Sequence, residues 1–169
     1  MLINDKKFLD ETTCRIIREC KKFSNKAGSF VDIGAGSDLY YEFLSPYFNK
    51  IYCVEEDSDL IEKIKSNIME SSLCNVEVVS ISSTIDNIVF LRISKCLTES
   101  FDFLKIKNYP PFIFSCYEHF ETNKKHLEKI GYAVSYLVDG IYLASSNALF
   151  ESREIKHLDI ESLIKHMSS

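Results

Sequence analysis

The sequence predicts an α/β fold, with a doubly wound, mostly parallel sheet that ends in an antiparallel hairpin. Short apolar runs alternate repeatedly with helical patterns, and such alternation joins parallel strands through right-handed crossovers. Near the end of the chain, Asp139-Gly140 separates two strand-like runs, which is a strong signal for a hairpin. The 169 residues suit one domain over 1–169, with its core at 29–145.

The individual elements follow from the period of the apolar residues and from the turn signals between them. Strands are predicted at Ser29–Ile33, Ile51–Val54, Asn75–Val79, Ile88–Ile93, Phe112–Tyr117, Tyr132–Val138 and Ile141–Ser145. Helices are predicted at Asp5–Phe23, Leu39–Phe48, Phe101–Ile106, Asn123–Ile130 and about 155–166, and one more begins at Ser58 as its N-cap. Residues 24–28 are predicted to break the chain between the first helix and the first strand.

Charge and cysteine content exclude several classes of function. The net charge of −5 argues against broad binding of nucleic acid, which needs a basic face, and it disfavours RNA methylation. The six cysteines form no C-x-x-C pair and follow no secretory leader, so we expect reduced thiols, a cytoplasmic protein and no metal site. No apolar run approaches the roughly 18 residues of a membrane span.

The chemistry is predicted to lie in the loop after the first strand, Asp32-Ile33-Gly34-Ala35-Gly36. Glycines there let the backbone approach a ligand where a Cβ would collide, and the helix that follows presents free N–H groups. We expect the Asp32 carboxylate to approach an amino group of the ligand and to repel a phosphate. A dinucleotide-binding G-x-G-x-x-G would need a third glycine, but position 39 is Leu.

Glu55 ends the second predicted strand about 20 residues after the loop, where a carboxylate can accept hydrogen bonds from ribose hydroxyls. NAD-binding domains share this feature, so a nucleotide-binding or NAD-binding domain stays an alternative. The missing third glycine and the final hairpin favour a different cofactor.

These residues resemble the class I S-adenosylmethionine-dependent methyltransferases, and among them the FkbM-like group. The resemblance covers about residues 29–145 and implies a Rossmann-like fold, S-adenosylmethionine as cofactor, and a cofactor site made by Asp32, Gly34, Ala35, Gly36, Glu55 and Glu56. The stretches that carry it are 32–38 against D-I-G-A-N-x-G, 54–56 against F-E-P, 84–87 against T-L-D-D, and 91–99 against I-K-I-D-V-E-G-A-E.

The sequence departs from the family pattern at four positions. Asp38 stands where the family has Gly, and Ser94, Cys96 and Leu97 replace its Asp, Glu and Gly at the end of the fourth strand. Class I enzymes place residues that face the methyl group there. A catalytically degenerate protein of the same fold, acting as a binding or regulatory module, is therefore the alternative to an enzyme.

Methyl transfer is an in-line displacement, so a general base is needed only when the acceptor is a protonated group such as a hydroxyl. Candidate catalytic residues follow the fifth and fourth strands. After the fifth strand, His119 could take the proton and Glu118 could orient His119; after the fourth strand, Ser94 is an alternative. The predicted function is O-methylation of a small-molecule, sugar or glycan hydroxyl.

Overall fold

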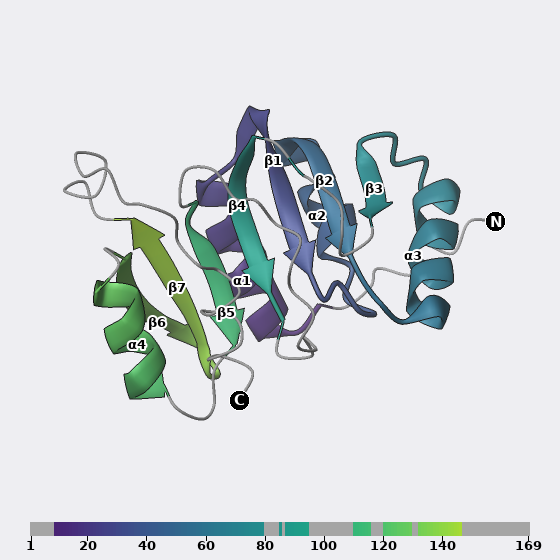
Figure 1. The fold of residues 1–169 in the computed structure, drawn as a ribbon. Coiled ribbons are helices and arrows are strands. Elements are labelled where there is room, and N and C mark those ends of the chain that lie inside the picture. Colours follow the sequence, from purple (N-terminus) through teal and green to yellow (C-terminus); the bar gives the residue numbers. More distant parts are fainter. Residues whose placement is uncertain are drawn as a thin grey trace.

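A computed structural model describes residues 9–79, 85, 87–94, 110–115, 120–129 and 132–146. They form a seven-stranded sheet in the order β3-β2-β1-β4-β5-β7-β6, with helices on both of its faces (Figure 1). The elements are α1 (Glu11–Lys22), β1 (Asn25–Ile33), α2 (Tyr40–Leu44), the 3₁₀ helix η1 (Ser45–Tyr47), β2 (Phe48–Val54), α3 (Ser58–Glu70), β3 (Val76–Val79), β4 (Ile88–Ile93), β5 (Phe112–Ser115), α4 (Phe120–Lys129), β6 (Tyr132–Val138) and β7 (Ile141–Ser146).

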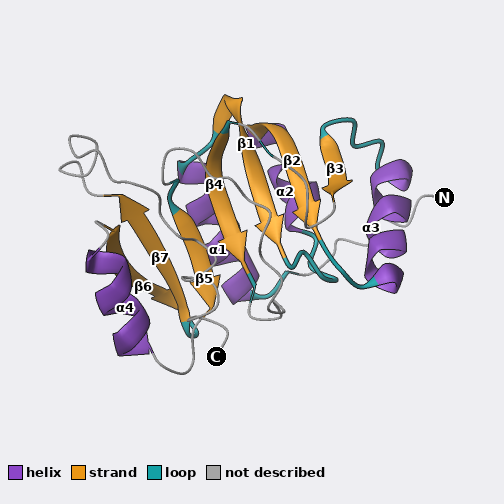
Figure 2. Cartoon of the chain, viewed as in Figure 1, coloured by secondary structure: helices purple, strands orange, loops and turns teal. Residues whose placement is uncertain are grey.

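The strand pairing confirms the predicted fold class. Strands β3, β2, β1, β4 and β5 are parallel, and β7 pairs antiparallel with both β5 and β6 (Figure 2). The chain runs outward from β1 to β3 and then returns to β4 on the other side of β1, so the strand order reverses at β1. In open α/β sheets ligands bind outside the carboxyl ends of the strands at such a reversal.

Aromatic residues fill the core on both faces of the sheet. On the face covered by α1 and α2, the ring centroids of Phe23 and Phe90 lie 4.6 Å apart, and those of Phe30 and Phe48 lie 5.3 Å apart. On the other face, Phe112 packs edge-on against Tyr132 at 5.3 Å. Because side chains of a strand alternate between faces, neighbouring residues of β1 and β4 belong to different clusters.

The predicted helix Leu39–Phe48 is wrong in its second half. The α-helix α2 ends at Leu44, η1 follows, and β2 begins at Phe48, three residues before the predicted start at Ile51. Pro46 explains the difference, because it lacks the N–H that would continue an α-helical hydrogen-bond ladder.

Strand β1 also begins earlier than predicted, at Asn25, although its register with β2 shifts between Asn25 and Ser29. Gly28, predicted to break the chain, instead allows β1 to approach β4 closely. A Cβ at Gly28 would lie 2.2 Å from Cγ1 of Val89. The glycine is therefore required by packing and not by a turn.

The N-cap of α3 is Asp57 and not the predicted Ser58. Oδ1 of Asp57 accepts hydrogen bonds from the backbone N–H groups of Asp59 at 2.9 Å and Leu60 at 3.1 Å. The predicted helices at 101–106 and 155–166 lie outside the described residues, as do residues 5–8 of the predicted helix Asp5–Phe23. In the described residues that helix begins later than predicted, at Glu11, because Asp10 is its N-cap and accepts from the N–H of Thr13 at 2.7 Å. In the part of the chain that is described, no helix has the length and apolar character to cross a bilayer.

Candidate functional site

The turn after β1 lies at the strand reversal and takes a conformation that favours glycine. Gly34 has a φ of 71° and Gly36 a φ of 58°. The backbone N–H of Gly34 donates to the carbonyl of Val54 at 2.9 Å, which fixes the turn to the end of β2. Among the described residues, a Cβ at Gly36 would lie 3.7 Å from the carbonyl oxygen of Gly34, which is an ordinary contact distance, so no close neighbour excludes a side chain there and the positive φ is what favours glycine.

Glu55 points toward this turn from the end of β2. Its Oε2 accepts from the backbone N–H of Gly36 at 2.8 Å, and its Oε1 accepts from those of Glu56 at 2.9 Å and Asp57 at 3.1 Å. A carboxylate has about four acceptor positions, so three are used by the backbone and one on Oε2 is left. The structure thus brings the predicted Gly34, Gly36 and Glu55 together.

The other two predicted cofactor residues lie beside this group in different ways. Ala35 is fully buried beneath the turn, and its N–H donates to the carbonyl of Val54 at 3.3 Å. Glu56 directs its backbone N–H to Glu55, while the residue itself is exposed. The contacts of these residues with a cofactor stay a prediction.

Asp32 is fully buried and forms an ion pair that crosses from β1 to β4. Nε of Arg92 donates to Oδ1 of Asp32 at 2.7 Å, and the two residues are register partners of the parallel strands. Oδ2 of Asp32 has no hydrogen-bond partner among the described residues. Arg92 thus occupies one oxygen of the Asp32 carboxylate. The expected contact of Asp32 with an amino group of the ligand stays a prediction.

Arg92 is the residue that the sequence analysis missed. Its Nη1 lies 3.4 Å from Oδ2 of Asp38, and its guanidinium carbon lies 4.1 Å from the centre of the Tyr40 ring. Nη2 is buried and has no partner in the described part of the chain. The available signal was a single charged residue inside the apolar run Ile88–Ile93, since a buried arginine needs a paired acid.

The two buried charges shift each other's proton affinity. Burial raises the pKa of Asp32, and the neighbouring Arg92 opposes that rise. Burial alone would lower the pKa of Arg92, but attraction from Asp32 and the hydrogen bond between them outweigh it, so the pKa lies above its usual value. The guanidinium therefore stays charged at every pH at which the protein is folded.

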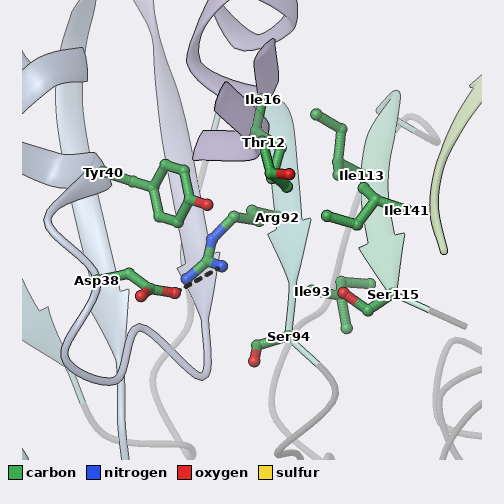
Figure 3. A pocket seen from close by; sticks show the side chains of 10 residues that line it. All are labelled: Thr12, Ile16, Asp38, Tyr40, Arg92, Ile93, Ser94, Ile113, Ser115 and Ile141. Atoms are coloured by element: carbon green, nitrogen blue, oxygen red, sulfur yellow. Dashed lines mark hydrogen bonds and ion pairs between the residues drawn. The ribbon is translucent and has the colours of Figure 1, made fainter. Parts of the chain in front are cut away.

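A cavity of about 250 Å³ lies at the carboxyl ends of β4 and β5, next to α1 (Figure 3). Its polar side chains come from α1, α2, β4 and β5 and from the loops after β1 and β4, and the guanidinium of Arg92 points toward Asp38 and Tyr40 in Figure 3. The lining residues are Thr12, Ile16, Asp38, Tyr40, Arg92, Ile93, Ser94, Ile113, Ser115 and Ile141.

Comparisons with known proteins find similarity in structure alone. No family model and no curated protein match the sequence. A dimethyladenosine transferase from Plasmodium falciparum aligns with a TM-score of 0.62 at 12% identity, over 84% of this chain and 63% of that chain. A precorrin-6y C5,15-methyltransferase from Geobacter metallireducens GS-15 aligns with a TM-score of 0.59 at 18% identity, over 84% of this chain and 92% of that chain. A SAM-dependent methyltransferase from Aquifex aeolicus aligns with a TM-score of 0.56 at 18% identity, over 81% of this chain and 93% of that chain.

The chain has a methyltransferase fold. At these identities the comparisons show the fold and leave the resemblance to the FkbM-like group a prediction. Within this methyltransferase fold, Glu55 and the cavity lie on opposite sides of β1, because β2 precedes β1 and β4 follows it in the sheet order.

The predicted catalytic residues are placed only in part. Ser94 follows the last residue of β4 and lines the cavity, and its backbone N–H donates to the carbonyl of Ile33 at 3.0 Å. Glu118 and His119 lie outside the described residues. The described residues contain no group of three or more His, Cys, Asp or Glu side chains that could hold a metal ion.

Proposed function

We propose that this chain is an S-adenosylmethionine-dependent methyltransferase whose cofactor lies against the turn after β1. The observation that supports it most is the hydrogen bond from Gly36 to Glu55. It places a carboxylate beside a glycine turn with positive φ angles, at the strand reversal of a sheet with methyltransferase topology. An adenosyl ligand needs this combination of bare backbone and ribose acceptor.

The residues of the turn fit such a ligand. No described residue crowds the place of a side chain at Gly36, and among the described residues Oε2 of Glu55 keeps one acceptor position, which suits a ribose hydroxyl. Gly34, Ala35 and Gly36 would contact the ligand through their backbone, and Glu55 and Glu56 would face its sugar. When bound, the cofactor supplies a methyl group on a sulfonium, so the protein's task is to align the acceptor with it.

We further propose that the acceptor is a hydroxyl of a small molecule, a sugar or a glycan. In this proposal the reacting group of the acceptor enters the cavity at the ends of β4 and β5, whose volume of about 250 Å³ is smaller than the roughly 300–1,000 Å³ of ligand pockets that enclose a whole molecule. Ser94 lines it and would orient the acceptor hydroxyl. In this proposal His119 takes the hydroxyl proton and Glu118 orients His119.

Isothermal titration with S-adenosylhomocysteine, the demethylated product, tests the cofactor site. The Glu55→Ala variant is expected to bind about 5- to 150-fold more weakly, because a charge-assisted hydrogen bond is lost and the turn is loosened. Glu62→Ala on α3 is the matched control, since that exposed carboxylate pairs only with Lys65 among the described residues. Equal affinities for all three proteins, or no binding by any, would overturn the proposal.

A binding or regulatory module of the same fold is the second candidate, and the contact between Asp38 and Arg92 favours it. That ion pair lies in the cavity where an acceptor would enter. A methyl-transfer assay over a panel of hydroxylated small molecules and glycans separates the two functions. Cofactor binding together with turnover supports the enzyme, whereas binding without turnover on the whole panel supports the module.

A further inference from the structure

We infer that Arg92 is the receptor for a ligand carboxylate, and that Asp38 is a built-in competitor for it. The inference deepens the proposed function by assigning a chemical group to the cavity, and it rests on that function for the identity of the ligand. It is carried by the three nitrogens of one guanidinium, each of which has a different environment.

The guanidinium of Arg92 is only partly satisfied by the protein. Nε binds Asp32 at 2.7 Å, and Nη1 lies at the longer distance of 3.4 Å from Asp38. Nη2 is buried without a hydrogen-bond partner among the residues described, as is Oδ2 of the Asp32 carboxylate that binds Nε, and the Arg92 side chain as a whole is 8% exposed. A buried donor of this kind is costly to leave unpaired, so an acceptor that displaces Asp38 from Nη1 and reaches the Nη1–Nη2 edge would gain a partner for both nitrogens.

A carboxylate is the acceptor that fits this edge best. Two parallel N–H groups of a planar guanidinium match the two oxygens of a carboxylate, whereas a single hydroxyl would satisfy one of them. The guanidinium carbon lies over the Tyr40 ring, 4.1 Å from its centre, and this contact fixes the orientation of the guanidinium plane. The position of the edge is therefore set before a ligand arrives.

Asp38 is the partner that a ligand can displace. The Asp32 side chain is fully buried in β1 and cannot leave, but the Asp38 side chain is 55% exposed and follows the glycine turn. Charge-assisted bonds are usually 2.7–2.9 Å long, so the 3.4 Å contact is weak, and half-exposed ion pairs contribute little. Three carboxylates around one guanidinium would repel each other, so a ligand carboxylate and Asp38 compete.

The cavity sets the size of the group that carries this carboxylate. It suits a group of about amino-acid size better than a whole nucleoside derivative, and Ser94 and Ser115 add hydroxyls to its wall. Two sources have this chemistry: the amino-acid end of the cofactor, and a carboxylate on the acceptor. Both would meet the same edge of Arg92.

The test compares Asp38→Asn with the wild-type chain at low ionic strength, using two adenosine ligands. S-adenosylhomocysteine carries the amino-acid carboxylate, and 5′-methylthioadenosine lacks it. If the cofactor supplies the carboxylate, Asp38→Asn tightens binding of S-adenosylhomocysteine by roughly 3- to 10-fold and changes that of 5′-methylthioadenosine by less than about two-fold. Asp59→Asn on α3, which removes an exposed carboxylate elsewhere, should change neither.

A third titration identifies the other source. Benzoate is titrated into protein saturated with 5′-methylthioadenosine. If Asp38→Asn binds benzoate more tightly than the wild type does, while the ratio of the affinities for the two adenosine ligands is unchanged, the carboxylate belongs to the acceptor. Arg92→Lys keeps the charge but removes the pair of parallel N–H donors. It should therefore weaken the binding of whichever ligand carboxylate binds more tightly to Asp38→Asn. Its folding is checked by urea unfolding.

The outcomes separate this inference from the proposed function. If 5′-methylthioadenosine binds but Asp38→Asn alters neither S-adenosylhomocysteine nor benzoate, the carboxylate receptor is wrong and the cofactor site stands. An equal gain for both adenosine ligands also overturns it, because the effect would not depend on a carboxylate. Failure of both adenosine ligands to bind any variant overturns the cofactor site, and benzoate titrated into the ligand-free chain then still tests Arg92 directly.

Discussion

Arg92 and Asp32 face each other across neighbouring parallel strands, with Nε and Oδ1 2.7 Å apart and both side chains buried. The pair lies beside the glycine turn and joins β1 to β4 at the point where the strand order reverses. Its charges are removed from water, so each depends on the other. This dependence makes the pair the most sensitive point of the candidate site.

Removing one member of this pair is expected to destabilise the fold strongly. Arg92→Met should lower the free energy of unfolding by about 3–5 kcal/mol, because it leaves the Asp32 carboxylate buried and unpaired. The double variant Asp32→Leu/Arg92→Met should lose much less than the sum of the single changes, since no charge is left alone. Urea unfolding of the four proteins measures the coupling; strictly additive losses would contradict it.

The close approach of β1 to β4 makes Gly28 sensitive to a single added carbon. Gly28→Ala would place a Cβ 2.2 Å from Cγ1 of Val89, so we expect a loss of about 1–3 kcal/mol from overpacking. Val89→Ala removes the two methyl groups involved and provides the matched background. If Gly28→Ala costs as much in the Val89→Ala chain as in the wild type, measured by denaturant unfolding, the predicted collision is not the cause.

The cap of α3 gives a second test of local structure. Asp57→Ala should lower stability by about 1 kcal/mol, because it removes the acceptor for two backbone N–H groups at the start of the helix. The adjacent Ser58→Ala is the control and should be close to neutral. A larger loss for Ser58→Ala in thermal or urea unfolding would restore the cap that the sequence predicted.

The cysteines are expected to differ sharply in reactivity. Burial raises the pKa of the Cys20 and Cys53 thiols, so at pH 8 they keep their protons and stay unreactive in the folded chain. Cys14 and Cys74 are exposed and should be labelled first. Timed maleimide labelling read by peptide mass spectrometry measures this order. Labelling of Cys20 or Cys53 at the rate of Cys14, without denaturant, would show that the core is open.

The fold was predictable because its signals are local. Alternating apolar periods and the Asp139-Gly140 turn each lie within a few residues, and the structure confirms the parallel sheet and hairpin that they indicate. The helix end at Leu44 was also marked locally, by Pro46, but the apolar spacing through Tyr47 outweighed that signal in the prediction.

The candidate site was predictable only where its residues follow one another or end adjacent strands. Gly36 and Glu55 met as expected, because parallel neighbours end at the same edge of the sheet. The partner of Asp32 lies 60 residues away, and their contact depends on the strand order and register of β1 and β4. Composition and spacing do not encode that register, so the sequence could mark Arg92 as a lone charge in an apolar run, but it could not identify Asp32 as its partner.

Glu55 has a consequence for the kinetics of binding. Its carboxylate accepts from the N–H groups of Gly36, Glu56 and Asp57 at the same time. The turn therefore loses its conformational entropy when the chain folds, before any ligand binds. A ligand that docks there meets a preorganised surface and has little disorder to remove. Association should therefore proceed as a single fast phase, without a slow rearrangement of the backbone after encounter.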